Sequence, residues 1–442
     1  MTTTTLPVVV IGAGPVGLAA AAHLAHRSIP CIVLEAGATA GAAVSEWGHV
    51  RLFSAWSELI DPVARTLLEA TGWVPSDPDT YPTGAEWVAD YLRPLANELD
   101  VVRLDHRVTA VTRADRDRLV SSGRDAAPFT VHVQGPGGPT VVRARAVIDA
   151  SGTWGGPNPL GADGVPATGE DVVGDRISRR IPDLDDPTTR SRYADRHVAV
   201  AGTGASAKSA LIGLTRLAES HPRTRVSWLV RRSEVDDAFA GSGQDELPER
   251  GALGRRAADA VSTGTVSTFL GFRSTAVDRQ PDGRLTVTAS DDRTVHDVDE
   301  VVVLTGFRPD LSMLSELRLD LDPVLQSPRA LAPLIDPNEH SCGTVAPHGA
   351  AELAHPETHF FVVGMKSYGR ATSFLALTGY EQTRSVVAAI AGDHEAAARV
   401  ELTLPATGVC GGSGEFDGTS TSSGCCGAPA EPRVIALGRS PT

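Results

Sequence analysis

Three glycines near the start of the chain have the spacing of a phosphate-binding turn. Gly12, Gly14 and Gly17 form a G-x-G-x-x-G pattern between an apolar run at residues 8–11 and an alanine-rich stretch at residues 15–26. The first glycine allows a tight turn, the second lets a pyrophosphate approach the backbone, and the third lets helix and strand pack closely. A helix beginning at this turn directs its positive end at the phosphates. The pattern predicts a dinucleotide-binding unit.

A carboxylate follows the next apolar run, where it can bind a ribose. The residues CIVLE predict a second strand, and Glu35 ends this strand. A carboxylate at this point accepts hydrogen bonds from unphosphorylated ribose hydroxyls, so the unit fits FAD or NAD. Its N-terminal place in the chain and its helix residues Ala19, Ala20 and Leu24 resemble FAD-binding flavoproteins with two dinucleotide-binding domains. That resemblance implies FAD.

A second pattern of the same kind occurs at residues 196–217. Gly202, Gly204 and Ala207 give G-x-G-x-x-A after an apolar run, and a helix is expected to follow them. The spacing is that of the first unit, with alanine at the third position, which dinucleotide-binding turns also use. The chain is therefore expected to contain two dinucleotide sites.

The second unit ends on positive charge. Its next predicted strand, at residues 224–232, finishes with Arg231 and Arg232 instead of an acid. A ribose 2′-phosphate needs a cationic group here, and an acid would repel it. The site is predicted to bind NADPH rather than NADH, with a solvated basic strand end as the alternative. The two sites thus differ in the side chains expected to bind the ribose, an acid at one and arginines at the other. This difference implies hydride transfer from NADPH to bound FAD.

Two further segments connect the units. Residues 141–158 and 298–314 resemble the segments by which such flavoproteins leave and re-enter the FAD domain, the second having an L-T-G-x-x-P-[DN] pattern. We expect an α/β fold with two Rossmann-like domains, in which the NADPH domain is inserted into a discontinuous FAD domain. The predicted boundaries are residues 1–164 and 299–404 for the FAD-binding domain, 165–298 for the NADPH-binding domain and 405–442 for a flexible Gly/Ser/Cys tail.

The two lysines of the chain both fall in nucleotide motifs. Residues 359–392 predict a buried strand, a turn at Gly364 and a long helix from about Ser373. In this class the helix N-terminus faces the flavin pyrimidine, where reduction places negative charge. Lys366, in the turn, could add a cation or a hydrogen bond to the isoalloxazine, with a plain surface role as the alternative. Lys208 could touch phosphate or be solvated.

An aromatic-rich stretch at residues 47–98 is expected to cover the flavin. Trp47, Phe53 and Trp56 are candidates for its wall, and core packing is the alternative for each. Over the whole chain, the predicted cofactor contacts are Gly12, Gly14, Pro15, Gly17, Glu35, Ala36, Trp47, Val108, Ser151, Gly152, Gly202, Gly204, Ser206, Ala207, Arg231, Arg232, Thr305, Gly306, Gly364, Met365 and Phe374.

Three of the five cysteines lie in a stretch dominated by Gly, Ser and Thr at residues 408–427. This composition is typical of a flexible segment that buries no core. Cys410, Cys425 and Cys426 could gather around one soft ion, because thiolates are the preferred ligands of soft metals. The alternative is an unstructured extension with incidental cysteines.

The other two cysteines have different settings. Cys342 lies in a loop at residues 336–359 that also holds four histidines, at positions whose spacing matches no standard zinc pattern. We expect a loop that reaches the flavin and exposes Cys342 to substrate or oxidant, which makes Cys342 a candidate catalytic residue beside Lys366. Cys31 lies within a predicted strand and is expected to be buried and inert.

Composition limits the partners. The formal net charge is −14, and no basic block stands out, which argues against nucleic acid and anionic membrane surfaces. No apolar run has the length of a bilayer span, and the first residues pass into a strand with no leader pattern. We expect a soluble cytoplasmic protein with small-molecule partners, and a homodimer remains open.

Longer stretches show a family resemblance. GAGPVGLAAAAHL, LFSAWSELIDP, PTGAEWVADYLRPLA, GTGASAKSAL, TGFRPD, VGMKSYGRATSFLALTGYEQ and the TGVC of the tail together resemble the FAD- and NADPH-dependent, flavin monooxygenase-like oxidoreductases of bacterial arsenic resistance operons. The resemblance covers nearly the whole chain. It implies hydride transfer from NADPH to FAD, activation of molecular oxygen at flavin C4a, and a small soft-atom substrate such as a trivalent arsenical.

Two departures keep other functions open. Flavin-containing and Baeyer–Villiger monooxygenases carry an F-x-G-x-x-x-H motif before their second glycine pattern. Residues 167–186, which precede the second glycine pattern here, lack this motif. The C-x-x-C or C-x-x-x-x-C pair of thioredoxin reductase relatives is missing as well. The alternatives are an NADPH-dependent flavin reductase that uses the tail cysteines as a dithiol or soft-metal shuttle, and a flavin-binding thiol sensor.

Overall fold

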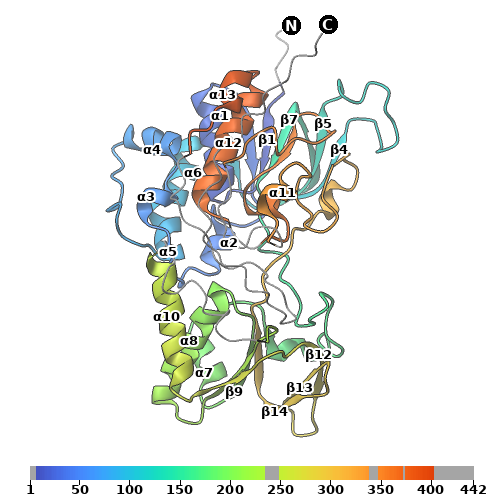
Figure 1. The fold of residues 1–442 in the computed structure, drawn as a ribbon. Helices are drawn as coiled ribbons and strands as arrows, with labels where there is room; N and C mark the ends of the chain where they lie inside the picture. The colour runs from blue at the N-terminus through green and yellow to red at the C-terminus, as the bar shows by residue number, and fades with distance from the viewer. Residues whose placement is uncertain (1–5, 234–247, 338–346, 372–373, 403–442) are drawn as a thin grey trace, which may run out of the picture.

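The first parallel sheet collects strands from both ends of the chain (Figure 1). The computed structural model describes residues 6–233, 248–337, 347–371 and 374–402. The strand order is β16-β7-β1-β2-β3, and every neighbouring pair is parallel. The strands are β1 (Val8–Ile11), β2 (Cys31–Leu34), β3 (Val102–Arg103), β7 (Ala146–Asp149) and β16 (Phe360–Val362). We call this sheet, with the elements packed on it, the first lobe. The pairing of β16 with β7 makes the first lobe discontinuous in sequence.

Helices cover one face of this sheet. The alanine-rich helix α1 (Pro15–His26) packs against α12 (Ala376–Ile390), and both are largely buried. Small side chains allow this close approach, since alanines occupy most of the middle of α1. The remaining helical segments of the lobe are α2 (Ala42–Ser45), α3 (Trp56–Leu59), α4 (Pro62–Glu69), α5 (Gly84–Trp87), the π-helix η1 (Val88–Leu92), α6 (Arg93–Leu99), η3 (Ser312–Leu314), α11 (Ala332–Ile335), η4 (Gly364–Tyr368) and α13 (His394–Ala398).

The second parallel sheet has the order β11-β10-β9-β15-β8. Its strands are β8 (Ile177–Ser178), β9 (His197–Ala201), β10 (Arg225–Leu229), β11 (Val266–Phe269) and β15 (Glu300–Val303). The helices of this lobe are η2 (Gly174–Arg176), α7 (Pro187–Tyr193), α8 (Ala205–Ser220) and α10 (Pro248–Ser262).

The chain returns from the second lobe to the first later than the predicted boundary after residue 298, because β15 still belongs to the second sheet. A boundary after residue 298 would separate β15 from its partners, because Val301 pairs with Ala199 of β9 and with Ile177 of β8. The apolar run at 301–303 is a central strand of the second sheet, buried on both faces. Its sequence alone does not reveal which sheet it joins, since buried parallel strands share the same apolar pattern.

Each lobe also carries a three-stranded antiparallel sheet. In the first lobe this is β4 (Arg107–Arg113), β5 (Phe129–Gly135) and β6 (Gly138–Ala144), and its inner face packs on β1 and β7. In the second lobe it is β12 (Ser274–Arg279), β13 (Leu285–Ala289) and β14 (Thr294–Val298), which packs on β9 and β15. Both lobes are therefore layered as helices, parallel sheet and antiparallel sheet.

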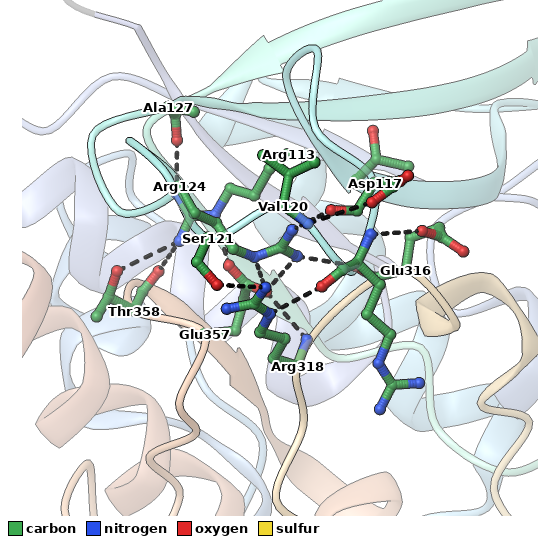
Figure 2. Close-up of polar contacts among 12 residues, drawn as sticks. Arg113, Asp117, Val120, Ser121, Arg124, Ala127, Glu316, Arg318, Glu357 and Thr358 are labelled. Carbon is green, nitrogen blue, oxygen red and sulfur yellow. Dashed lines mark hydrogen bonds and ion pairs between the residues drawn. The ribbon is translucent and has the colours of Figure 1, made fainter.

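A buried ion-pair cluster fixes the start of β16 in the first lobe (Figure 2). Glu357 accepts from Arg113 Nε at 2.6 Å and from Arg124 Nη2 at 2.7 Å, and all three side chains are almost fully buried. Arg124 also donates to the carbonyls of Asp117 and Glu316. Because buried charges of this kind need complete pairing, the cluster ties the β4–β5 connection to the segment before β16.

Candidate functional site: two dinucleotide-binding turns

The first glycine turn lies at the carboxyl end of β1. Gly12 has φ +98°, which favours glycine, and a Cβ on Gly17 would lie only 2.0 Å from the carbonyl oxygen of Gly12. Around Gly14, by contrast, no protein atom lies within 4 Å of an added Cβ. The turn thus leaves open space beside Gly14 at the N-terminus of α1. Open space at this point fits the pyrophosphate of a dinucleotide.

Glu35 lies beside this turn, as predicted from its place after β2. Its Oε2 accepts from Ala13 N at 2.7 Å, and its Oε1 accepts from Gly37 N at 2.7 Å. Both bonds involve backbone amides, so they fix the carboxylate at the end of β2. A carboxylate held here is suited to accept from ribose hydroxyls, and the group therefore fits the adenosine half of FAD.

The second turn repeats this geometry at the end of β9. Gly202 has φ +122°, and a Cβ on it would lie 2.2 Å from the carbonyl oxygen of Leu304. Gly204, like Gly14, would have no protein atom within 4 Å of an added Cβ. The third position, Ala207, is fully buried where α8 packs on the sheet. Ser206 and Lys208 lie in the first turn of α8, and both are half-buried.

Three arginines gather near the end of β10. Arg231 Nη1 donates to Ala162 O at 3.4 Å, while Gly271 N donates to Arg232 O at 2.7 Å. This second bond brings the chain before β12 against the end of β10. Burial, followed by the nearby charges of Arg232 and Arg273, lowers the pKa of Arg231. The predicted pair of arginines is thus joined by Arg273, which sequence reasoning missed because it lies outside the fingerprint.

The crossing segments contribute the next predicted residues. Gly152 and Gly306 have φ +69° and φ +93°, the left-handed values that favour glycine. Asn158 N donates to Gly306 O at 2.9 Å, so the outgoing and returning segments lie side by side. Thr305 and Ser151 are both exposed near these turns.

Lys366 is deeply buried, so the alternative of a plain surface role is wrong. Its side chain is 2% exposed, and its Nζ donates to Asp149 Oδ2 at 2.7 Å and to Ser151 Oγ at 3.1 Å. Ser151 Oγ in turn donates to Asp149 Oδ1 at 2.6 Å. The partner Asp149 was missed from sequence, because it lies 217 positions from Lys366 and ends an apolar strand.

A buried hydrogen-bond network holds the turn that carries Lys366. Gln382 Oε1 accepts from Gly364 N at 2.7 Å, and its Nε2 bonds to Ser367 Oγ at 3.0 Å and to His348 Nε2 at 2.8 Å. Helix α12 supplies Gln382 from its buried face. The helix begins at Ala376, and its predicted start at residue 373 lies outside the described residues.

The other candidate contacts differ in burial. Trp47 packs over Gly84, where an added Cβ would lie 2.8 Å from its ring, and Trp56 is buried in the core. Phe374 packs edge-on against Tyr368, with ring centroids 4.9 Å apart. Val108 packs into the core between the sheets of the first lobe. The remaining candidates are half-buried or exposed: Pro15, Ala36, Phe53 and Met365.

Of the five cysteines, Cys31 is the one within the described residues. It is half-buried at the start of β2, and burial raises the pKa of its thiol to about 11. A thiol with this pKa carries very little thiolate near neutral pH, which fits the prediction of an inert residue. The candidates Cys342, Cys410, Cys425 and Cys426 lie outside the described residues.

The described residues contain no group of three or more His, Cys, Asp or Glu side chains arranged to hold a metal ion. No helix within the described ranges combines the length and apolar character needed to cross a membrane.

The two glycine turns, each at the carboxyl end of a strand in its own parallel sheet, fit a flavoprotein with two dinucleotide-binding domains. The sequence matches the pyridine nucleotide-disulphide oxidoreductase family over residues 9–341. The chain belongs to this family. It is a pyridine-nucleotide-dependent flavoprotein oxidoreductase, with FAD and NADPH as cofactors. Among curated proteins, none matches the sequence significantly.

Solved structures with the same fold include enzymes of more than one type. Bacillithiol disulfide reductase from Bacillus cereus is 22% identical with a TM-score of 0.63, covering 88% of this chain and 99% of that chain. Flavin-containing monooxygenase from Stenotrophomonas maltophilia is 21% identical with a TM-score of 0.55, covering 88% and 98%. Ornithine N-hydroxylase from Kutzneria sp. 744 is 22% identical with a TM-score of 0.55, covering 88% and 99%. These likenesses establish the shared fold.

Proposed function

We propose that the protein is an NADPH-dependent FAD monooxygenase that acts on a small soft-atom substrate, with a trivalent arsenical as the preferred candidate. The observation that carries the proposal is the pair of glycine turns with opposite ribose readers. A fixed carboxylate stands at one turn, and arginines stand at the other. That difference assigns an unphosphorylated ribose to one turn and a 2′-phosphorylated ribose to the other, so the two cofactors occupy different lobes.

The cofactor roles follow from this geometry. We assign the pyrophosphate of FAD to the turn at Gly14 and that of NADPH to the turn at Gly204, where the backbone leaves space. Glu35 would bind the adenosine ribose of FAD, while Arg231 and Arg232 would bind the 2′-phosphate of NADPH. When bound, the flavin accepts a hydride from NADPH and passes the electrons to an acceptor such as oxygen.

Lys366 has a positioning and electrostatic role in this proposal. Its ammonium is held between Asp149 and Ser151 at the carboxyl ends of β7 and β16. Ligands of parallel sheets bind outside these strand ends. The buried Asp149 fixes the ammonium, and Lys366 in turn orients Ser151 at the start of the first crossing. A fixed cation favours negative charge that develops nearby on reduction.

The domain division is proposed with one change. The FAD domain takes the chain up to the first crossing and again from the return crossing, and the NADPH domain lies between them. Because β15 pairs with β9, we place the return after Leu304 rather than after residue 298.

We propose oxygen as the acceptor, because the sequence holds no C-x-x-C or C-x-x-x-x-C pair of the kind that a dithiol relay beside the flavin uses. A soft nucleophile such as trivalent arsenic needs no general base to take an oxygen atom. The tail cysteines Cys410, Cys425 and Cys426 are proposed to capture this substrate, since thiolates bind soft ions.

The test follows oxygen and product together. Purified protein with NADPH is supplied with a panel of trivalent arsenicals, and oxygen uptake, peroxide and oxidised arsenic are measured. Oxygen uptake matched by oxidised product supports the proposal. Anaerobic turnover of a disulfide or metal ion would replace it with the reductase alternative, and peroxide alone would indicate an oxidase.

Capture by the tail is tested separately. Replacing Cys410, Cys425 and Cys426 by serine is expected to weaken arsenite binding while FAD content and NADPH oxidation stay intact. Unchanged arsenite binding, measured by equilibrium dialysis, would return the tail to an incidental extension.

A further inference from the structure

The two crossing segments, at residues 154–158 and 305–308, pair with each other through backbone hydrogen bonds. Asn158 N donates to Gly306 O at 2.9 Å, and Arg308 N donates to Gly156 O at 2.8 Å. A Cβ on Gly156 would lie 2.4 Å from Arg308 O, so the two backbones are in direct contact. The covalent connection between the lobes is therefore a short two-stranded ribbon.

Aromatic side chains from both segments stack beside this ribbon. The rings of Trp154 and Phe307 have centroids 5.1 Å apart and planes inclined by 29°. The guanidinium carbon of Arg180 lies 3.8 Å from the centre of the Trp154 ring and 5.8 Å from that of Phe307. Offset aromatic stacking and a cation over a tryptophan face are both attractive. Arg180 belongs to the second lobe, between β8 and α7.

Glu46 extends the stack into the first lobe. It follows α2 directly, and its Oε2 accepts from Trp154 Nε1 at 2.8 Å and lies 3.5 Å from Arg180 Nε. Arg180 also donates to the carbonyl oxygen of Trp154 at 3.1 Å. Because the side chains of Arg180 and Glu46 are 32% and 57% exposed, their ion pair alone is weak. The stack and the directional hydrogen bond make the contact specific.

We propose that Trp154, with Arg180 and Glu46, is a positioning residue that holds the two lobes in the arrangement required for hydride transfer. The proposal rests on the proposed function, in which the hydride passes from a nucleotide in one lobe to a flavin in the other. Transfer needs reacting atoms about 3–3.5 Å apart, so a small displacement of one lobe lowers the rate. The three side chains act through the lobes and need no contact with either cofactor.

We call the contact of Trp154 with Arg180 and Glu46 the clamp. Anaerobic reduction of the bound flavin by NADPH tests it. Trp154→Leu removes the stack, the cation–π contact and the bond to Glu46, and reduction at saturating NADPH is expected to slow by about tenfold, which corresponds to about 1.4 kcal/mol. FAD content and the Kd of NADP+ are expected to be unchanged. The matched control is Trp73→Leu, because Trp73 Nε1 bonds to Asp90 O at 2.9 Å within the first lobe alone.

Two milder variants keep the packing. Glu46→Gln retains an acceptor for Trp154 Nε1 and loses the ion pair, and Trp154→Phe retains the ring and loses the bond. Each is expected to slow reduction less than Trp154→Leu does, and they replace it if that variant fails to fold. Rates equal to those of wild type and Trp73→Leu in all three would overturn the clamp.

Small-angle X-ray scattering separates this inference from the proposed function. Trp154→Leu is expected to increase the radius of gyration relative to wild type and Trp73→Leu, whether or not NADPH reduces the flavin. Identical scattering curves would overturn the clamp. A wild-type protein that NADPH does not reduce would instead overturn the proposed function.

Discussion

The two lobes repeat one topology and differ at the residues to which we assign the choice of dinucleotide. The first runs β1-α1-β2-β3, an antiparallel sheet, then β7; the second runs β9-α8-β10-β11, an antiparallel sheet, then β15. In both, the last strand returns beside the first, and an edge strand from elsewhere in the chain completes the sheet. In the proposed function, the repeated part binds a dinucleotide and the differing residues select which one.

The third position of the fingerprint shows how the units differ in packing. At Gly17 an added Cβ would lie 2.0 Å from the carbonyl oxygen of Gly12, whereas the second unit holds Ala207 at the same position. The first unit therefore leaves no room for a methyl group at this position, whereas the second unit buries one.

Gly17→Ala is expected to have the largest effect on this comparison. The new Cβ would overlap a backbone oxygen, so the turn must shift, with a loss of about 3 kcal/mol or more of unfolding free energy. Thermal unfolding of the apoprotein and FAD content after desalting measure the two consequences. Normal stability and full FAD content would show that the first helix has the same freedom as the second.

The charge difference between the units is tested by Arg231→Ala. Losing a charge-assisted hydrogen bond to phosphate is worth about 1.5–3 kcal/mol, so the KM for NADPH is expected to rise by about 10–100-fold. The KM for NADH is expected to stay the same. Arg273→Ala is expected to act in the same direction. Arg225→Ala, at the opposite end of β10, is the control, and equal changes for both nucleotides would refute the ribose assignment.

Gly14→Ala and Gly204→Ala test the two lobes separately, because each variant is expected to weaken binding of the dinucleotide in its own lobe only. Both glycines have extended φ values that alanine accepts, and a Cβ at either would meet no protein atom within 4 Å. Stability should therefore hold. Each variant is expected to lose about tenfold in affinity, or about 1.4 kcal/mol, for the dinucleotide of its own lobe alone. Titrations with FAD and NADP+ measure this, and a loss in the other lobe would contradict the assignment.

Ala207→Gly is expected to have the smallest effect. Removing a buried methyl near the start of α8 costs less than about 1 kcal/mol in helix propensity, and the fingerprint tolerates either residue. A small fall in melting temperature with unchanged NADPH kinetics is expected. A large loss of NADPH binding would mean that the methyl itself shapes the second turn.

Much of each unit was predictable because the signals are local. The structure confirms the strand at 8–11, the helix at 15–26 and the position of Glu35 directly after the second strand. Spacing and apolar runs predict these features because they act within a few residues. Helix α12 begins at Ala376, and its predicted start at about residue 373 lies outside the described residues. Arg273 was missed. Neither a helix start without a capping residue nor a cation in a separate segment before β12 leaves a readable pattern in one stretch of sequence.

The sequence by itself determined that there are two dinucleotide turns and that one has an acid and the other arginines. These features depend on backbone freedom and charge at fixed spacings. Tertiary structure alone decided that β15 joins the second sheet, that Asp149 and Ser151 pair with the buried Lys366, and that Trp154 lies between Glu46 and Arg180. These contacts join segments far apart in the chain, and long-range pairing depends on how the sheets assemble, which no local pattern encodes.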